Sequence, residues 1–434
     1  MIKRAFLHFG PHFEEVMSFL LFLIRGGEKY PHLANCELRF LPNPTEIPYL
    51  PEGMKFSECL FIGIGKELTR DLIAAGVPAD QIIDEHKGTG RDEDSSFRKL
   101  IKLLGLGEDK YLSRWADALG LKDSGKGGDN FTVYRALSAI YSAERENCSC
   151  EEGFNWAMEI ARASFADEKY FVKGERPQMA GRFFERLSCV WACLRSGALK
   201  KEQALDEFFF TGWQNCSANF PNTLRRLEKD TDESLFQIIR MAENGSQRSL
   251  SPLGLPRLLY AYYEKQGLEK TISAACLALD AEKRKQQNFL AALKIVEDAK
   301  QIPLNDGETF TLFVYSNNDQ VNCAARHLYG EKIGVIYQEG NFPKRSVQIF
   351  TNGRTTISLE SLYLEIMAEE TRLEIARQKK PEKKWHYLTG NNDTLLNGSS
   401  SYPGVPSTLI TSRWFEEKIP RLAEFRSLSG KKAA

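Results

Sequence analysis

Two histidines and two glutamates lie close together near the start of the chain, in the stretch FLHFGPHFEEVMS at residues 6–18. His8, His12 and Glu14 follow the pattern H-x-x-P-H-x-E-x-x-x-S on a turn between an apolar strand and a helix. Imidazole and carboxylate groups that converge from such a turn can bind a divalent metal ion that activates water for attack on phosphorus. The N-terminus of the following helix favours an anionic group nearby. We interpret the adjacent Glu15 as a first-turn acid that complements the helix dipole.

A second group of candidate residues lies in IIDEHKGTG at residues 82–90, where Asp84 and His86 follow another short apolar run. We predict both as catalytic residues, and His86 also as a metal ligand. Asp123, in LKDSGKGGD, is a further candidate ligand, with Asp117 as its competitor. A plain turn-forming role for Asp123 fits the glycine-rich stretch equally well.

Basic residues provide candidate substrate contacts. Lys87 and Lys126 stand in glycine-bearing loops whose backbone N–H groups could cradle phosphate, although surface turns would have the same composition. In the C-terminal region, His386 follows a basic run in KKWHYLTG and lies beside Trp385. Basic and aromatic residues together bind single-stranded nucleic acid by charge and stacking, while a Trp anchored on the surface is the alternative. The remaining candidates for phosphate contact are Lys344, Arg345 and Arg354.

The elements that must position these residues form three predicted parts. Residues 1–145 alternate apolar strand-like runs with helical runs, which is typical of a parallel α/β sheet whose functional residues collect at the carboxyl ends of strands. Residues 146–300 carry apolar residues at helical spacing and are predicted as a helical insertion or cap. Residues 301–434 return to an α/β pattern and are predicted as a smaller substrate-positioning domain.

Composition narrows the class of protein. The chain has 434 residues, and its 58 basic residues balance its 58 acidic residues, which argues against a protein that coats nucleic acid by bulk charge. Nine scattered cysteines suit a reducing cytoplasm. The apolar run VMSFLLFLI at 16–24 is shorter than the roughly 20 residues that span a bilayer, so no membrane association is expected.

The opening motif resembles the first motif of the DHH phosphoesterase superfamily, which is usually H-x-x-P-D-x-D with a small residue or Ser closing it. His12 stands where the first Asp is expected, Glu14 stands where the second is expected, and Ser18 matches the closing Ser. The sequence DEH at 84–86 resembles the D-H-H signature of that superfamily, with Glu85 in place of its first His.

Within the superfamily, the chain most resembles the melanocyte-proliferating-gene-type exonuclease branch, which also carries a His in the first motif. That branch uses an Asp of its second motif to bridge two manganese ions, and here Gly63 in FIGIGK takes its place. The strand–helix–strand–strand order at 308–351 is similar to the second domain of that branch. The resemblance covers the first and last 130 residues or so, and the helical middle has no counterpart in it.

The resemblance implies a cytoplasmic phosphodiesterase or exonuclease that acts on single-stranded nucleic acid or short nucleotides with one or two Mn²⁺ ions. The ligands that it implies are His8, His12, Glu14, His86 and Asp123. The alternative is a catalytically inactive relative that binds nucleic acid, a nucleotide or a protein partner, and Gly63 and Glu85 favour it. The helical middle is the predicted surface for a protein partner, and a homodimer is also predicted.

Overall fold

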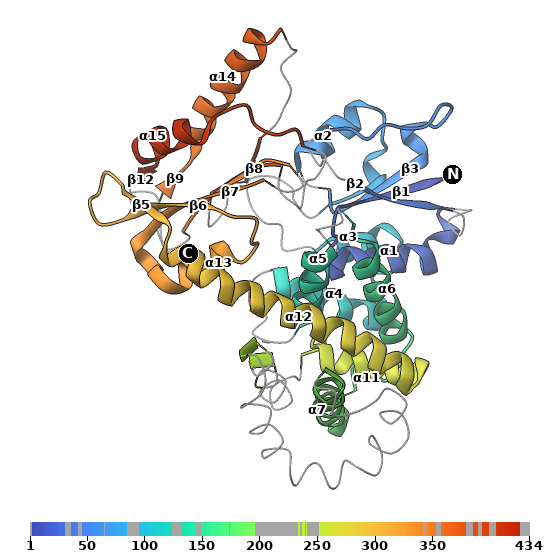
Figure 1. Ribbon diagram of the computed structural model, residues 1–434. Coiled ribbons are helices and arrows are strands. Elements are labelled where there is room, and N and C mark those ends of the chain that lie inside the picture. The colour runs from blue at the N-terminus through green and yellow to red at the C-terminus, as the bar shows by residue number, and fades with distance from the viewer. Residues whose placement is uncertain are drawn as a thin grey trace, which may run out of the picture. The chain divides into compact units, whose positions relative to one another are not determined.

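The computed structural model describes residues 2–30, 36–41, 46–64, 66–84, 95–123, 132–144, 149–172, 174–195, 233–234, 237–238, 240, 251–341, 344–352, 357–378, 385–388, 393–398 and 405–425. It divides into two compact units, Met1–Gln286 and Gln287–Ala434 (Figure 1). The three-part division expected from the sequence, with boundaries at 145 and 300, stays a prediction.

The first unit is built on a four-stranded parallel sheet in the order β2-β1-β3-β4. Its strands are β1 (Arg4–His8), β2 (Glu37–Leu41), β3 (Cys59–Ile62) and β4 (Ile82–Ile83). All four strands and the helix α1 (Phe13–Arg25) confirm the elements expected from the apolar runs. Because the strands are parallel, their carboxyl ends lie along one edge of the sheet, which is the edge that carries candidate residues.

Both faces of this sheet are covered, as is typical of parallel sheets. Successive residues of β1 point to opposite faces, so Leu7 joins the main core while Phe6 packs in a smaller cluster with Leu68 and Leu72 of α2 (Lys66–Ala74). The main core lies against α1, α3 (Ser96–Leu103) and α4 (Lys110–Asp123). The mixed α/β class predicted for this region is confirmed.

The helical middle is confirmed, and it shares the main core with the sheet. Its described helices are α6 (Glu151–Phe165), α7 (Glu175–Arg195), α11 (Leu255–Gln266) and α12 (Leu268–Glu297), and α5 (Val133–Glu144) directly precedes them. Phe154 of α6 contacts Phe19 of α1 and Phe40 of β2, with ring centroids 6.2 and 5.2 Å apart. The helices therefore bury their apolar faces on the same core that supports the candidate residues.

The second unit contains a six-stranded sheet in the order β10-β11-β8-β7-β6-β5, in which only the β6–β7 pair is parallel. The strands are β5 (Lys300–Pro303), β6 (Phe310–Tyr315), β7 (Ile333–Gly340), β8 (Ser346–Thr351), β10 (His386–Leu388) and β11 (Thr394–Asn397). A separate two-stranded sheet pairs β9 (Ile357–Ser358) with β12 (Glu424–Phe425).

Helices cover both faces of the six-stranded sheet. One apolar cluster joins the strands to α13 (Val321–Tyr329) and to the last turns of α12. The other cluster joins them to α14 (Glu360–Ala376) and α15 (Ser412–Leu422). The strand, helix, strand and strand expected over 308–351 correspond to β6, α13, β7 and β8.

Candidate metal site

The connection between β1 and α1 carries both histidines of the opening motif. His8 is the last residue of β1, and His12 is the N-cap of α1. Gly10 between them has a φ of +71°, a conformation that favours glycine, and Pro11 follows it. This tight turn places both imidazoles and the first turn of α1 at the carboxyl edge of the sheet.

His8, His12 and Glu15 form a group of metal-ligating side chains. Glu15 Oε1 lies 3.3 Å from His8 Nε2 and 3.6 Å from His12 Nδ1, and the three donor atoms all lie within 4.8 Å of one another. Nitrogen and oxygen ligands bind one ion at about 2.0–2.2 Å, which places neighbouring ligands roughly 3–3.5 Å apart. The group therefore fits a single divalent cation with little movement.

The hydrogen bonding of His8 supports this fit. Its Nδ1 lies 3.1 Å from the carbonyl oxygen of Phe9, so a proton on Nδ1 can be donated to that carbonyl. In this tautomer Nε2 presents a lone pair directly toward the Glu15 carboxylate, and such a pair of electron-rich atoms requires a proton or a metal ion between them. The same Nδ1–H to carbonyl bond is the usual device that orients a ligating histidine.

Glu15 is a buried carboxylate with a free oxygen. Its side chain is 4% exposed, and Oε2 has no hydrogen-bond partner among the described residues. Burial raises the pKa of Glu15, but the His12 and His8 imidazoles outweigh burial and bring that pKa well below its ordinary value. A buried, ionised oxygen without a partner is costly, and a cation would satisfy it. The His12 side chain is 69% exposed, which leaves one side of the group open to solvent.

The sequence predicted Glu14 as the ligand and Glu15 as a dipole-complementing acid, and the structure places the two acids the other way round. Glu14 Oε1 accepts a hydrogen bond from the backbone N–H of Phe97 at 3.2 Å, in the first turn of α3. Consecutive helical residues point roughly 100° apart, so the two carboxylates face different neighbours. Glu14 complements the N-terminus of α3, while Glu15 faces the histidines.

Gly63, which follows β3, borders the same carboxylate. Its φ is +64°, and a β-carbon at this position would lie 2.5 Å from Glu15 Cγ and 2.7 Å from Glu15 Oε1. The space that a side chain at position 63 would enter is therefore occupied by Glu15. This contact gives a structural reason for glycine at position 63.

Replacing Gly63 by alanine should weaken Mn²⁺ binding about tenfold, because the new methyl group displaces Glu15. Gly105→Ala is the matched control, since Gly105 has a φ of +71° and open space around its β-carbon position. Both variants should lose stability from the strained backbone, but only Gly63→Ala should lose metal affinity in a calorimetric titration. Equal affinities in the two variants would contradict the proposed contact.

Asp84 lies at the same edge of the sheet but outside the ligand group. It follows β4 and is buried, with Thr69 Oγ1 3.5 Å from its Oδ2 and Lys99 Nζ 2.7 Å from its carbonyl oxygen. The sheet order places β3 between β1 and β4, which separates Asp84 from His8 by two strand spacings, roughly 10 Å. Among the described residues, the group of side chains that could hold one ion comprises His8, His12 and Glu15 and does not include Asp84, whose catalytic role stays a prediction.

Four predicted site residues lie outside the described residues: His86, Lys87, Lys126 and Arg354. Asp123 is the last residue of α4, which differs from the turn expected at this position, and its side chain also lies outside the described part. The roles predicted for these five residues stay predictions.

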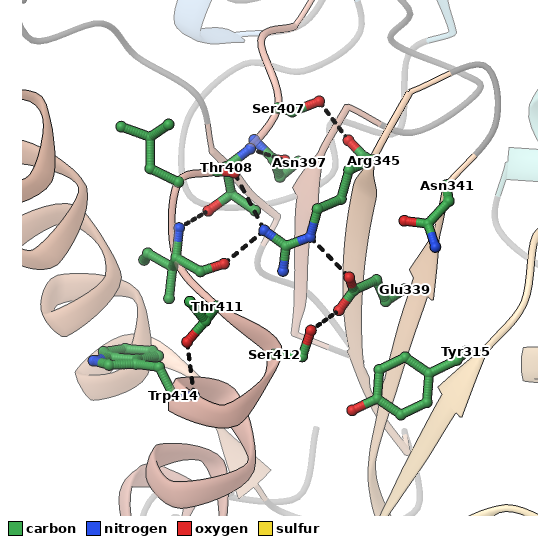
Figure 2. A network of polar contacts seen from close by, with 12 residues as sticks. Tyr315, Glu339, Asn341, Arg345, Asn397, Ser407, Thr408, Thr411, Ser412 and Trp414 are labelled. Carbon is green, nitrogen blue, oxygen red and sulfur yellow. Dashed lines mark hydrogen bonds and ion pairs between the residues drawn. The ribbon is translucent and has the colours of Figure 1, made fainter. Parts of the chain in front are cut away.

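In the second unit, Arg345 belongs to a polar network between β7 and the start of α15 (Figure 2). Its Nε donates to Glu339 Oε1 at 2.8 Å, and its Nη1 donates to the carbonyl oxygens of Thr408 and Ile410 at 3.2 and 2.6 Å. Glu339 Oε2 also accepts from Ser412 Oγ at 2.7 Å. The guanidinium thus links the loop before α15 to Glu339 of the sheet, and Glu339 in turn binds the first residue of α15. The phosphate contact predicted for Arg345 stays a prediction.

The other two substrate candidates of this unit also contact the protein itself. Lys344 Nζ donates to the carbonyl oxygen of Val405 at 2.5 Å. His386 is the first residue of β10 and lies opposite Leu396, with its side chain half-buried. The neighbouring Trp385 is buried in the core, where its Nε1 donates to Glu370 Oε1 at 3.1 Å. Trp385 is thus a core residue, which contradicts both roles considered for it from the sequence, stacking on nucleic acid and anchoring on the surface.

The fold and the ligand group define a mixed α/β protein with a candidate divalent-cation site at the carboxyl edge of a parallel sheet. In comparisons with known proteins, no family model matches the chain, and no curated protein is significantly similar to it. Across the described residues, none of the helices has the length and apolar character needed to cross a bilayer.

Proposed function

We propose that the protein is a metal-dependent hydrolase of phosphodiester bonds in single-stranded nucleic acid or short nucleotides. The observation that carries this proposal is the convergence of His8, His12 and Glu15, with a buried and unpartnered oxygen of Glu15, at the carboxyl edge of the sheet. The resemblance of the opening motif to DHH phosphoesterases supports the same reaction class. Mn²⁺ is the expected cofactor, held by these three side chains.

Each side chain has a definite part in this proposal. Glu15 stays ionised at neutral pH, because its pKa lies well below the ordinary range, and it supplies the negative charge that balances the cation. His8 is oriented by the Phe9 carbonyl, so its Nε2 lone pair faces the site. The exposed His12 borders the open side, where substrate and water enter. A bound divalent ion would supply Lewis-acid stabilisation of phosphoryl oxygens and lower the pKa of water.

A second candidate function is a catalytically inactive module that binds a nucleotide, nucleic acid or a protein partner. Gly63 favours this alternative, because Glu15 fills the space from which a second acid would reach the site. Three ligands suffice for one ion, whereas two-metal hydrolases hold ions about 3.5–4 Å apart with further acids. The proposed cytoplasmic location, the homodimer and a partner on the helical middle are compatible with both candidates.

Hydrolysis of short single-stranded oligonucleotides and dinucleotides with Mn²⁺ tests the two candidates. We expect turnover by the intact protein and a loss of at least about 100-fold in His12→Gln, because the substitution removes a ligand of the ion. His327→Gln serves as the control, since His327 belongs to α13 of the second unit and should leave turnover unchanged. His86→Ala, assayed in parallel, tests the predicted catalytic role of His86.

The outcomes separate the candidates. Mn²⁺ that binds stoichiometrically without hydrolysis of any phosphodiester would favour the binding module. Turnover that survives His12→Gln would remove the ligand group from the reaction and contradict the proposed mechanism.

A further inference from the structure

The connection that carries His8 and His12 packs against a tyrosine of helix α5. Tyr141 of α5 donates a buried hydrogen bond from its hydroxyl to the carbonyl oxygen of Pro11, at 2.9 Å and across 130 residues of sequence. Its ring also lies under Gly10, where a β-carbon would be 3.6 Å from Tyr141 Cδ2. Gly10 and Pro11, which lie between the two histidines, therefore both contact the Tyr141 side chain.

Tyr141 is itself held firmly by the start of α6. A β-carbon at Gly153 would lie 2.6 Å from Tyr141 Cε1, so only glycine at this position admits the ring. The Glu144 carboxylate accepts hydrogen bonds from the backbone N–H groups of Glu152 and Gly153, at 2.8 and 2.9 Å. These bonds fix the first turn of α6 against the end of α5, and the Tyr141 ring is buried against Gly153.

We propose that Tyr141 is a positioning residue that fixes the conformation of the turn at residues 9–11, and thereby the separation of the His8 and His12 imidazoles. Helix α5 thus determines how well the ligand group is preorganised for a cation. The proposal rests on the proposed function only for the identity of the ion. The Tyr141 ring packs directly under the connection, and its hydroxyl fixes the peptide that precedes His12, so the effect is transmitted through the backbone.

Tyr141→Phe tests this proposal, because it removes the hydroxyl and keeps the ring. The matched control is Tyr111→Phe in the same unit, where the tyrosine hydroxyl donates to the carbonyl oxygens of Ser164 and Phe165 at 3.1 and 3.0 Å. Both variants lose a hydrogen bond from a tyrosine hydroxyl to the backbone, buried for Tyr141 and part-buried for Tyr111, so a general loss of stability affects both. Of these two tyrosines, Tyr141 is the one whose hydroxyl bonds to the connection between β1 and α1.

Two measurements on the full chain detect the effect of Tyr141→Phe on the two histidines. The first is the NMR spectrum of ¹³C-labelled histidine rings in metal-free protein, where six histidines can be assigned by single substitutions. We expect the His8 and His12 signals to shift or broaden in Tyr141→Phe and to stay in place in Tyr111→Phe. The second is Mn²⁺ affinity by electron paramagnetic resonance, which should weaken about tenfold in Tyr141→Phe alone.

Failure of this proposal is distinct from failure of the proposed function. Unchanged His8 and His12 signals in Tyr141→Phe, or equal changes in both variants, would overturn the positioning role. Intact protein that binds no Mn²⁺ would overturn the metal site, while the histidine spectra would still decide whether Tyr141 fixes the turn.

Discussion

Glu15→Gln should weaken Mn²⁺ binding by at least about 100-fold, whereas Glu14→Gln should leave the affinity within about threefold, because only Glu15 presents its carboxylate to both histidines. Loss of a ligand exceeds the tenfold to 100-fold effects typical of residues that merely orient ligands. Glutamine keeps the shape of glutamate and removes the charge that balances the cation. Titration calorimetry with Mn²⁺ on both variants measures the difference.

The two adjacent substitutions control for each other. Both side chains are buried in the first turn of α1 and both lose one charge, so any general effect of burying an amide appears in both. Glu14→Gln keeps an oxygen that accepts the Phe97 N–H bond, and its main effect should be on the docking of α3. A result in which Glu14→Gln loses the metal and Glu15→Gln retains it would restore the ligand assignment made from the sequence.

Arg345→Met should lower the free energy of unfolding of the second unit by about 3 kcal/mol, because it leaves a buried carboxylate without its cation. Glu339 is only 7% exposed, and burial opposes its ionisation, yet the hydrogen bonds from Arg345, Tyr337 and Ser412 bring its pKa below the ordinary value. Urea denaturation of the full chain, followed by tryptophan fluorescence, measures the loss.

The pH dependence of stability gives a second test of the ion pair between Arg345 and Glu339. A carboxyl group whose pKa is lowered by folding adds stability that is complete above its ordinary pKa of 4.5 and disappears as the pH falls through the folded value. The difference in stability between Arg345→Met and the intact protein should therefore be largest near pH 7 and should shrink below pH 4.5. A difference that is constant over this range would exclude the Glu339 charge as its cause.

The double variant Arg345→Met with Glu339→Gln provides the control. Removing both charges should cost less than the sum of the two single substitutions, because no uncompensated charge remains buried. If Arg345 instead serves mainly as a phosphate contact, Arg345→Met should leave stability unchanged and weaken nucleotide binding.

The fold could be predicted from the sequence because its elements are marked by local patterns. The strand at 4–8 and the helix at 13–25 follow from an apolar run closed by Gly and Pro and from the apolar residues after it. The strands β6, β7 and β8, which come after Pro303, are likewise marked by local apolar runs in the sequence. By contrast, no local pattern shows that α6 packs on α1 and β2, since the contact of Phe154 with Phe19 joins residues far apart in the chain.

The site could be predicted only in part, and the choice between Glu14 and Glu15 shows why. Residues from Phe13 to Phe22 are all buried, so α1 has no solvent-exposed face from which the direction of either acid could be read. His8 and His12 were found because their spacing places them on the turn. Glu15 was missed because its direction depends on how α1 packs, and Tyr141 was missed because nothing near it in sequence points to the turn.

The same burial of α1 has a consequence for how this chain tolerates variation. Because residues 13–22 of α1 are all buried, this part of the helix cannot rotate or slide to compensate for a longer or shorter connection before it. The segment 9–11 should therefore accept exchanges of Phe9 more readily than any insertion or deletion, since one added residue would change the distance between His8 on β1 and the His12–Glu15 pair on α1. We therefore expect natural variants of this segment to keep its length.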